Sequence, residues 1–257
     1  MRIVVKVGTS TLTHTTGRMD IRHVETLCKV LSDVKNAGYE IVLVSSGAIG
    51  MGVGKLNLRE RPADMPGKQA AAAVGQCELM YVYDKLFNQY NHTIAQILLT
   101  GEDLRDDARH QNFSNTVGRL LELGVLPVIN ENDTVSTAEI AVGDNDTLGA
   151  LVAESVHADL LIVLTDIDGL YTADPRRDTH AKLIPEVREI TQQMRESAGG
   201  GGTALSTGGM ATKLIAADIC MKAGCDMVIL NGSKPLLVYD VLEGKQVGTR
   251  FIGRKQK

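Results

Sequence analysis

The chain has 257 residues, 44% of them hydrophobic and 23% charged, a composition that is ordinary for a globular protein with a sizeable core. Its formal net charge of −4 argues against a general attraction for nucleic acid or an anionic membrane, so we expect small metabolites as partners, with no nucleic acid and no membrane. No apolar run approaches the length of a membrane span, and a lysine interrupts the first one, which argues against a signal peptide. These features predict a soluble, cytoplasmic protein.

One domain over residues 1–257 is predicted, because no linker rich in proline, serine or charge interrupts the alternating helix and strand patterns. The cysteines match neither a zinc ribbon nor a C-x-x-C redox pair; they are Cys28, Cys77, Cys220 and Cys225. We therefore expect reduced cysteines in the hydrophobic core.

The first predicted element is a buried strand at residues 3–7, a β-branched run that ends at Gly8. Its lysine, Lys6, is unusual, because a lysine within an apolar strand is costly unless it is paired or placed at an open strand end. Lys6 therefore lies either at the rim of a site or on an edge strand, and we favour the site.

Helices and strands alternate over the rest of the chain. The helical pattern predicts helices at residues 20–37, 70–90, 112–123, 147–156, 214–223 and 236–242, and a short strand and helix within 183–195. Short apolar runs predict strands at residues 41–44, 94–99, 125–129, 160–164 and 227–230, and a closing edge strand at 249–252. The charged run 101–110 is typical of a solvated helix face. This alternation predicts an α/β fold with a mainly parallel sheet and helices on both faces.

Polar residues follow several of these strands, at the ends where an open parallel sheet forms its ligand crevice. They include Thr9 and Ser10, Ser45 and Ser46, residues 130–133, Thr165 and Asp166, and Asn231. The spacing of Gly50, Gly52 and Gly54 is not G-x-G-x-x-G, and no G-x-x-x-x-G-K occurs. The sequence thus gives no support for a Rossmann dinucleotide site or a Walker P-loop.

A glycine-rich stretch, residues 199–213, leads into the helix predicted at 214–223. Thr207 suits the N-cap position, and Gly208 and Gly209 would let the backbone approach a ligand closely. The first N–H groups of the helix, with Lys213 nearby, suit an anion. A surface loop before an ordinary helix is the alternative.

Acidic and amide residues gather at the loop 130–133 and at residues 144–146. Asp146 suits the N-cap of the helix predicted at 147–156, yet with Asp133 these residues are more than one cap requires. Lys6 and Lys213 suit phosphate oxygens, and the Asp/Asn loops suit an ammonium group, a hydroxyl or Mg²⁺. Phosphoryl transfer depends mainly on positioning and charge neutralisation. A carboxylate acceptor, with a pKa of about 4.3, would need no general base.

Several segments together resemble the amino acid kinase superfamily, and most closely its glutamate 5-kinases. They are residues 6–10, 44–48, 129–133, 142–146, 165–166, 169–175 and 207–213. The resemblance covers essentially the whole chain in the right order. It implies a three-layer αβα sandwich with a mainly parallel, roughly eight-stranded central sheet.

The resemblance also implies an activity, the ATP-dependent phosphorylation of the side-chain carboxylate of L-glutamate to L-glutamyl 5-phosphate, the first step of proline biosynthesis. Mg²⁺ would be bound with the nucleotide. By position, Ser46, Asp133 and Asn145 would hold glutamate, and Lys6 and Lys213 would flank the transferring phosphoryl group, oriented by Asp146. The positions that would hold ATP are Lys6, Thr165, Asp166, Thr207, Gly208, Gly209, Met210, Ala211, Thr212 and Lys213.

The partners implied by the resemblance are L-glutamate, L-proline as a feedback inhibitor, further copies of the chain in a dimer or tetramer, and glutamate-5-semialdehyde dehydrogenase as recipient of the product. The chain stops at Lys257, so we expect no C-terminal PUA domain. Two alternatives remain. One is a sibling kinase acting on N-acetylglutamate, aspartate or UMP, and the other is a catalytically silent amino-acid sensor, against which Lys6, Lys213 and Asp146 argue.

Overall fold

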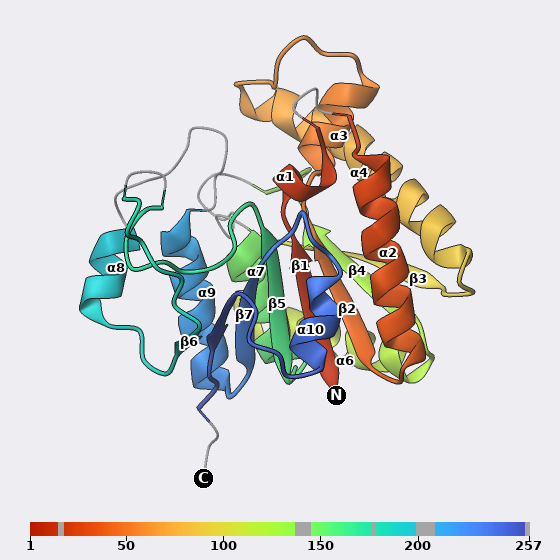
Figure 1. The fold of residues 1–257 in the computed structure, drawn as a ribbon. Helices are drawn as coiled ribbons and strands as arrows, with labels where there is room; N and C mark the ends of the chain where they lie inside the picture. The colour runs from red at the N-terminus through yellow and green to blue at the C-terminus, as the bar shows by residue number, and fades with distance from the viewer. Residues whose placement is uncertain (15–17, 137–144, 176–177, 199–208, 255–257) are drawn as a thin grey trace.

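The computed structural model describes residues 1–14, 18–136, 145–175, 178–198 and 209–254 (Figure 1). Within them, eight strands form one sheet in the order β3-β4-β2-β1-β5-β7-β8-β6. The strands are β1 (Arg2–Val7), β2 (Glu40–Ser45), β3 (Ile94–Leu99), β4 (Leu126–Glu131), β5 (Leu160–Thr165), β6 (Glu186–Val187), β7 (Asp226–Asn231) and β8 (Thr249–Phe251).

The sheet is mainly parallel, as predicted. β1 pairs in parallel with β2 on one side and β5 on the other, and β7 and β8 form the antiparallel pair. The prediction of an edge strand at 249–252 is wrong, because the two-residue strand β6 pairs with the outer side of β8. A strand as short as β6 has no apolar alternation of its own from which this pairing could be predicted.

Helices cover both faces of the sheet and complete a three-layer sandwich (Figure 1). One face packs against α2 (Ile21–Asn36), α4 (Met65–Asn88) and α10 (Leu237–Leu242), and the other against α6 (Asp107–Glu122), α7 (Asn145–Ser155) and α9 (Met210–Ala223). Side chains alternate along each strand, so Ile3 and Val5 of β1 belong to the first core and Val4 to the second. The predicted αβα sandwich is confirmed.

Helix boundaries differ from prediction where polar side chains cap the first turn. α4 starts before residue 70, because Asp64 accepts a hydrogen bond from Gly67 N (3.0 Å) and a proline occupies the first turn. The charged run 101–110 covers α5 (Gly101–Arg105) and the start of α6. Thr100 and Asp103 form a capping box for α5, and Asp106 caps α6. The carboxylates of Asp103 and Asp106 therefore cap helices rather than only facing solvent.

No helix was predicted at α1 (Thr9–Leu12) or α3 (Ala48–Lys55), and α8 (Gln192–Ala198) begins within the segment 183–195 where a short strand and helix were predicted. α3 contains three glycines, which make it a poor helix by propensity alone. Two glycines show why it forms. A Cβ added at Gly52 would lie 1.8 Å from the carbonyl oxygen of Ala71, and one added at Gly75 would lie 1.7 Å from that of Ala48. α3 and α4 thus pack with their backbones in contact.

The cysteine prediction is correct for three residues. Cys28, Cys220 and Cys225 are buried, whereas Cys77 lies on the exposed side of α4 and corrects the expectation that all were in the core. All four are free thiols. In the described ranges, no helix combines the length and the apolar character needed to cross a bilayer.

Candidate active site

Asp146 is the centre of a buried ion cluster at the carboxyl edge of the sheet. Its side chain is completely buried, and its Oδ1 lies 2.5 Å from Lys6 Nζ while its Oδ2 lies 3.0 Å from Lys213 Nζ. Burial alone would raise the pKa of Asp146, but the charges and hydrogen bonds of the two lysines hold this pKa below its ordinary value. The site thus contains an ionised carboxylate between two ammonium groups.

The N-cap interpretation of Asp146 is wrong. α7 begins at Asn145, so Asp146 lies inside the first helical turn. Its carboxylate contacts the two lysines, which lie on β1 and on α9. The side chain therefore joins three elements.

Lys6 reaches Asp146 because of its place in β1. β1 lies between β2 and β5, so Lys6 is not on an edge strand. It shares the face of Val4, which packs in the core of α7 and α9. A Cβ added at Gly149 of α7 would lie 3.3 Å from Lys6 Cβ, so this glycine lets the helix approach the strand closely. Lys6 is only 7% exposed, and its charge is paired.

Lys213 comes from the first turn of α9. The helix starts at Met210 with Gly209 as N-cap, so the prediction of Thr207 at that position is wrong. Thr207 and Gly208 lie outside the described residues. Within the residues described, no side chain caps this helix. The first N–H groups of a helix have no partner inside the helix and suit an anion. Thr212 Oγ1 donates to the Gly209 carbonyl (2.8 Å).

A second polar group lies where β2, β4 and α7 meet. Asn145 Nδ2 donates to Ser45 O (3.0 Å), to Ser46 Oγ (2.8 Å) and to Asn130 Oδ1 (3.0 Å). Asn145 is next to Asp146 in the chain, so this group adjoins the ion cluster. The structure thus brings together Ser46 and Asn145, two of the three residues predicted to hold the acceptor.

The third, Asp133, follows β4 and is partly buried. Burial and the nearby carboxylate of Glu131 raise the pKa of Asp133 to about 6, while Arg61 opposes that rise. Among the described residues, no hydrogen bond joins Asp133 to Ser46 or Asn145. Asp133 is thus a carboxyl group with a pKa raised to about 6, on the loop that follows β4.

Thr165 and Asp166 lie at the carboxyl end of β5, next to β1. Thr165 is buried, its Oγ1 donates to Asp166 Oδ1 (3.2 Å), and its carbonyl accepts from Gly232 N (2.6 Å). Asp166 is exposed. These two predicted ATP-binding residues therefore share one edge of the sheet with Lys6.

Two contributors to this region were not among the predicted site residues. Asn130 is the next-to-last residue of β4 and is 2% exposed. Its Nδ2 donates to Oε1 of Gln76 (2.9 Å), which is 8% exposed. Gln76 was detectable in principle, because it occupies the same face of α4 as the buried Ala72 and Leu79. A polar residue on a buried helix face needs a partner.

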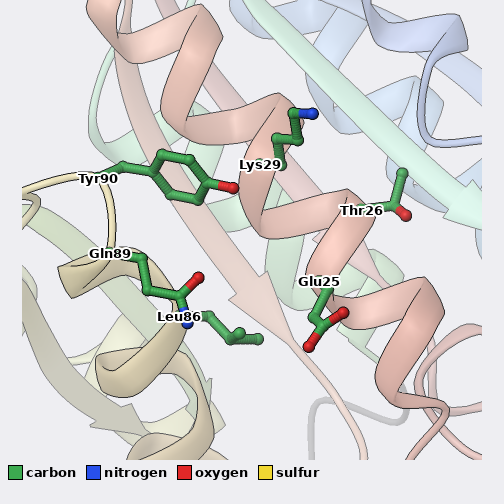
Figure 2. Close-up of a pocket in the computed structure, with 6 residues that line it drawn as sticks. All are labelled: Glu25, Thr26, Lys29, Leu86, Gln89 and Tyr90. Carbon is green, nitrogen blue, oxygen red and sulfur yellow. The ribbon is translucent and has the colours of Figure 1, made fainter.

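A pocket of about 290 Å³ lies elsewhere, between α2 and the end of α4 (Figure 2). Figure 2 shows its lining: Glu25, Thr26, Lys29, Leu86, Gln89 and Tyr90. None of the predicted site residues lines it. The chemistry of the ion cluster, not this pocket, identifies the candidate site.

Comparisons with known proteins identify the family of the chain. The model of the amino acid kinase family matches residues 1–231. The chain is 50% identical to the glutamate 5-kinase of Clostridium perfringens over 99% of this chain and 96% of that one. It is 55% identical to the glutamate 5-kinase of Clostridium tetani over 97% and 93% of the two chains.

Among solved structures, carbamate kinase from Giardia lamblia bound to AMP-PNP superposes with a TM-score of 0.70, covering 98% of both chains at 17% identity. At that identity the likeness shows the fold alone. The family model and the sequence relatives go further, since they match nearly the whole chain. The chain therefore belongs to the amino acid kinase family.

Proposed function

We propose that this chain transfers the γ-phosphoryl group of ATP to the side-chain carboxylate of L-glutamate, which forms L-glutamyl 5-phosphate and opens proline biosynthesis. The observation that carries the phosphoryl transfer is the cluster in which Asp146 binds both Lys6 and Lys213. The acceptor is supported by the relatives named glutamate 5-kinase, which are 50% and 55% identical to this chain.

The chemistry needs no proton acceptor. An oxygen of the acceptor carboxylate forms a bond to the γ-phosphorus while the bond from that phosphorus to the bridging oxygen breaks, and ADP leaves with the electron pair. The carboxylate is already ionised at neutral pH. Lys6 and Lys213 supply fixed positive charge to the phosphoryl oxygens, and Asp146 holds both ammonium groups in place before the substrates arrive.

The nucleotide would bind at the start of α9 and the end of β5. The N–H groups after Gly209 and the ammonium of Lys213 suit its phosphates, and Thr165 and Asp166 lie at the same edge of the sheet. Residues 210–212 supply backbone there, and Thr207 and Gly208 precede it.

Mg²⁺ would accompany the nucleotide and neutralise charge on its phosphate oxygens. Both carboxylate oxygens of Asp146 contact lysines, so this residue is engaged with cations already. In the part of the chain that the structure describes, no group of three or more His, Cys, Asp or Glu side chains could hold a metal.

The acceptor would lie beside Ser46 and Asn145. The amide hydrogens of Asn145 are directed at Ser45, Ser46 and Asn130, so Oδ1 is the atom that Asn145 offers to a ligand. This oxygen can accept a hydrogen bond from the α-ammonium group of an amino acid, and the ionised carboxylate of Asp133 can pair with the same group. This charge pattern favours glutamate over acceptors that lack the amino group.

Trapping of the acyl phosphate with hydroxylamine tests the proposal. The purified chain is incubated with ATP, Mg²⁺ and each acceptor in turn: L-glutamate, N-acetyl-L-glutamate, L-aspartate and, by ADP release, UMP. We expect hydroxamate from L-glutamate at a rate well above that of the other acceptors. A faster reaction with another acceptor would identify a sibling kinase, and the absence of turnover with all of them would favour a sensor.

Inhibition by L-proline, assembly into a dimer or tetramer, and handover of the product to glutamate-5-semialdehyde dehydrogenase stay predictions from the family resemblance. The same holds for a single domain over residues 1–257.

A further inference from the structure

Four amide side chains form a hydrogen-bonded chain that runs from Asn145, beside Ser46, to β3, the outer strand of the sheet. Asn145 Nδ2 donates to Asn130 Oδ1 (3.0 Å), Asn130 Nδ2 donates to Gln76 Oε1 (2.9 Å), and Gln76 Nε2 donates to Gln96 Oε1 (3.2 Å). Asn130 and Gln76 are buried, while Gln96 is exposed on the edge strand β3. Every hydrogen bond of this chain therefore has its donor on the side of Asn145 and its acceptor on the side of β3.

Two backbone groups show which end of each asparagine amide is the oxygen. The N–H of Glu131 donates to Asn130 Oδ1 (2.8 Å), and the carbonyl of Ser45 accepts from Asn145 Nδ2 (3.0 Å). A backbone N–H can only donate and a carbonyl can only accept, so neither asparagine can be reversed without facing like with like. Asn130 Nδ2 must then point away from Glu131 N, and Gln76 supplies the oxygen that it meets.

We propose that Gln76 is a positioning residue that sets the specificity of the site for an acceptor with an α-ammonium group. By accepting from Asn130 Nδ2, it holds the Asn130 amide at the position where Asn130 Oδ1 meets Asn145 Nδ2, and Asn145 Oδ1 is then the atom presented to the ligand. The proposal rests on the proposed function, because it takes the acceptor to be an amino acid. It adds a buried residue on α4 to the residues predicted for the site.

The backbone of Gln76 is itself well placed to hold this direction. Gln76 follows Gly75, where α4 is in contact with the Ala48 carbonyl of α3, and α3 begins shortly after Ser46. The glutamine can therefore shift little relative to Ser46. Its side chain transmits that fixed position to Asn130 and Asn145.

Two substitutions of Gln76 separate positioning from simple packing. Gln76→Met has similar length and removes both hydrogen bonds, whereas Gln76→Glu keeps an oxygen that can accept from Asn130 Nδ2. Both replace a buried amide, and both should lower the melting temperature. Only Gln76→Met removes the oxygen to which Asn130 Nδ2 donates.

The readout is the ratio of kcat/KM for L-glutamate to kcat/KM for glutarate, the same dicarboxylate without the amino group. We expect Gln76→Met to lower this ratio by about tenfold or more, because a site built to bind a polar group discriminates through that group. The KM for ATP should stay within about twofold, and Gln76→Glu should retain most of the ratio. Gln96→Met serves as the matched control: it removes only the exposed end of the amide chain and should leave the ratio unchanged.

A ratio within about twofold of the original in Gln76→Met would overturn the inference, as would an equal loss for both acceptors. A second readout does not depend on turnover. Solvent exchange of the Asn145 side-chain amide, followed by NMR, should be slow in the unsubstituted chain and in Gln76→Glu and faster in Gln76→Met; equal rates would overturn the inference too. Failure of the unsubstituted chain to phosphorylate glutamate would contradict only the proposed function, since the NMR result stands separately.

Discussion

Lys213 Nζ lies 3.0 Å from Asp146 Oδ2, although 67 positions separate the two residues in the sequence. Lys213 is 3% exposed and Asp146 is fully buried. Because Asp146 also binds Lys6, one carboxylate faces two ammonium groups, and these three side chains together carry an excess of positive charge. Such an arrangement is suited to an anion that arrives with several negative charges, and it is the basis of the first two predictions.

Lys213→Ala should lower kcat for glutamyl phosphate formation by at least about 100-fold, because it removes a fixed charge that acts on the transferring group. The hydroxylamine assay measures the rate, and circular dichroism checks the fold. Lys222→Ala is the matched control on the same helix, since Lys222 is exposed and pairs only with Asp218 at 2.7 Å among the described residues. Turnover of Lys213→Ala equal to that of the control would contradict the assignment.

Asp146→Asn should lower kcat and also destabilise the fold, by about 3–5 kcal/mol, because it removes the carboxylate that pairs with two buried lysines. The lysines lower the pKa of Asp146 in the folded state, so its ionisation stabilises the fold above its unfolded pKa of about 3.9, and this contribution disappears as pH falls through the folded pKa. Urea unfolding of both proteins from about pH 3 to pH 7 tests the sign. A stability difference that grows on acidification would refute this role of Asp146.

The KM for glutamate should depend on the ionisation of Asp133. Burial and Glu131 raise the pKa of Asp133 to about 6, so the carboxylate is lost below that pH and the KM for glutamate should rise there. The KM for ATP should not follow this change. Asp133→Asn should raise the glutamate KM and abolish its inflection near pH 6, whereas Arg61→Leu should move the inflection upward, because Arg61 holds the pKa down. An inflection that survives in Asp133→Asn belongs to another group.

L-Proline should inhibit by competing with glutamate. It carries the same α-carboxylate and a protonated α-nitrogen but has no side-chain carboxylate, so it can occupy the groups that hold the amino-acid end without being phosphorylated. Initial rates over a grid of proline and glutamate concentrations measure this, and saturating glutamate should relieve the inhibition. Inhibition that persists at saturating glutamate would place proline at a different site.

Gly75→Ala should destabilise the chain by about 1–3 kcal/mol or more, because the new methyl group would lie 1.7 Å from the Ala48 carbonyl oxygen. Gly118→Ala in α6 is the control, since among the described residues outside the neighbouring backbone of α6 no atom lies within 4 Å of a Cβ added there. That substitution should leave stability unchanged or raise it by up to about 1 kcal/mol, because alanine is the better helix former. Equal effects of the two changes in urea unfolding would show that α3 and α4 can move apart at little cost.

The fold was largely predictable from the sequence, because its signals are local. The apolar run around Lys6 and its β-branched neighbours predicted the first strand, and the alternation of strands with amphipathic segments predicted the parallel sheet. α3 could not be predicted in this way, since Gly52 lowers its helix propensity and becomes favourable only through its contact with α4.

The site was less accessible to such reasoning. The approach of Lys6, Asp146 and Lys213 to one point depends on three elements distant in the sequence, and only the family resemblance linked them beforehand. The N-cap position of α9 was misplaced, because Thr207 and Gly209 both suit a helix start and the local sequence does not choose between them. Gln76 was overlooked because the residue it binds lies on another element.

Because the backbones of α3 and α4 are in contact, Ser46 and Gln76 keep a fixed position relative to each other. Ser46 is followed closely by α3, and Gln76 belongs to α4. At Gly52 and Gly75 no side chain separates the two helices, so no rotamer change could absorb a shift of one against the other. A ligand that displaced one helix would therefore have to displace the other. To change the acceptor preference of this chain, one should therefore exchange side chains and leave the backbones of α3 and α4 in place. The distance between these two helices has little freedom to change.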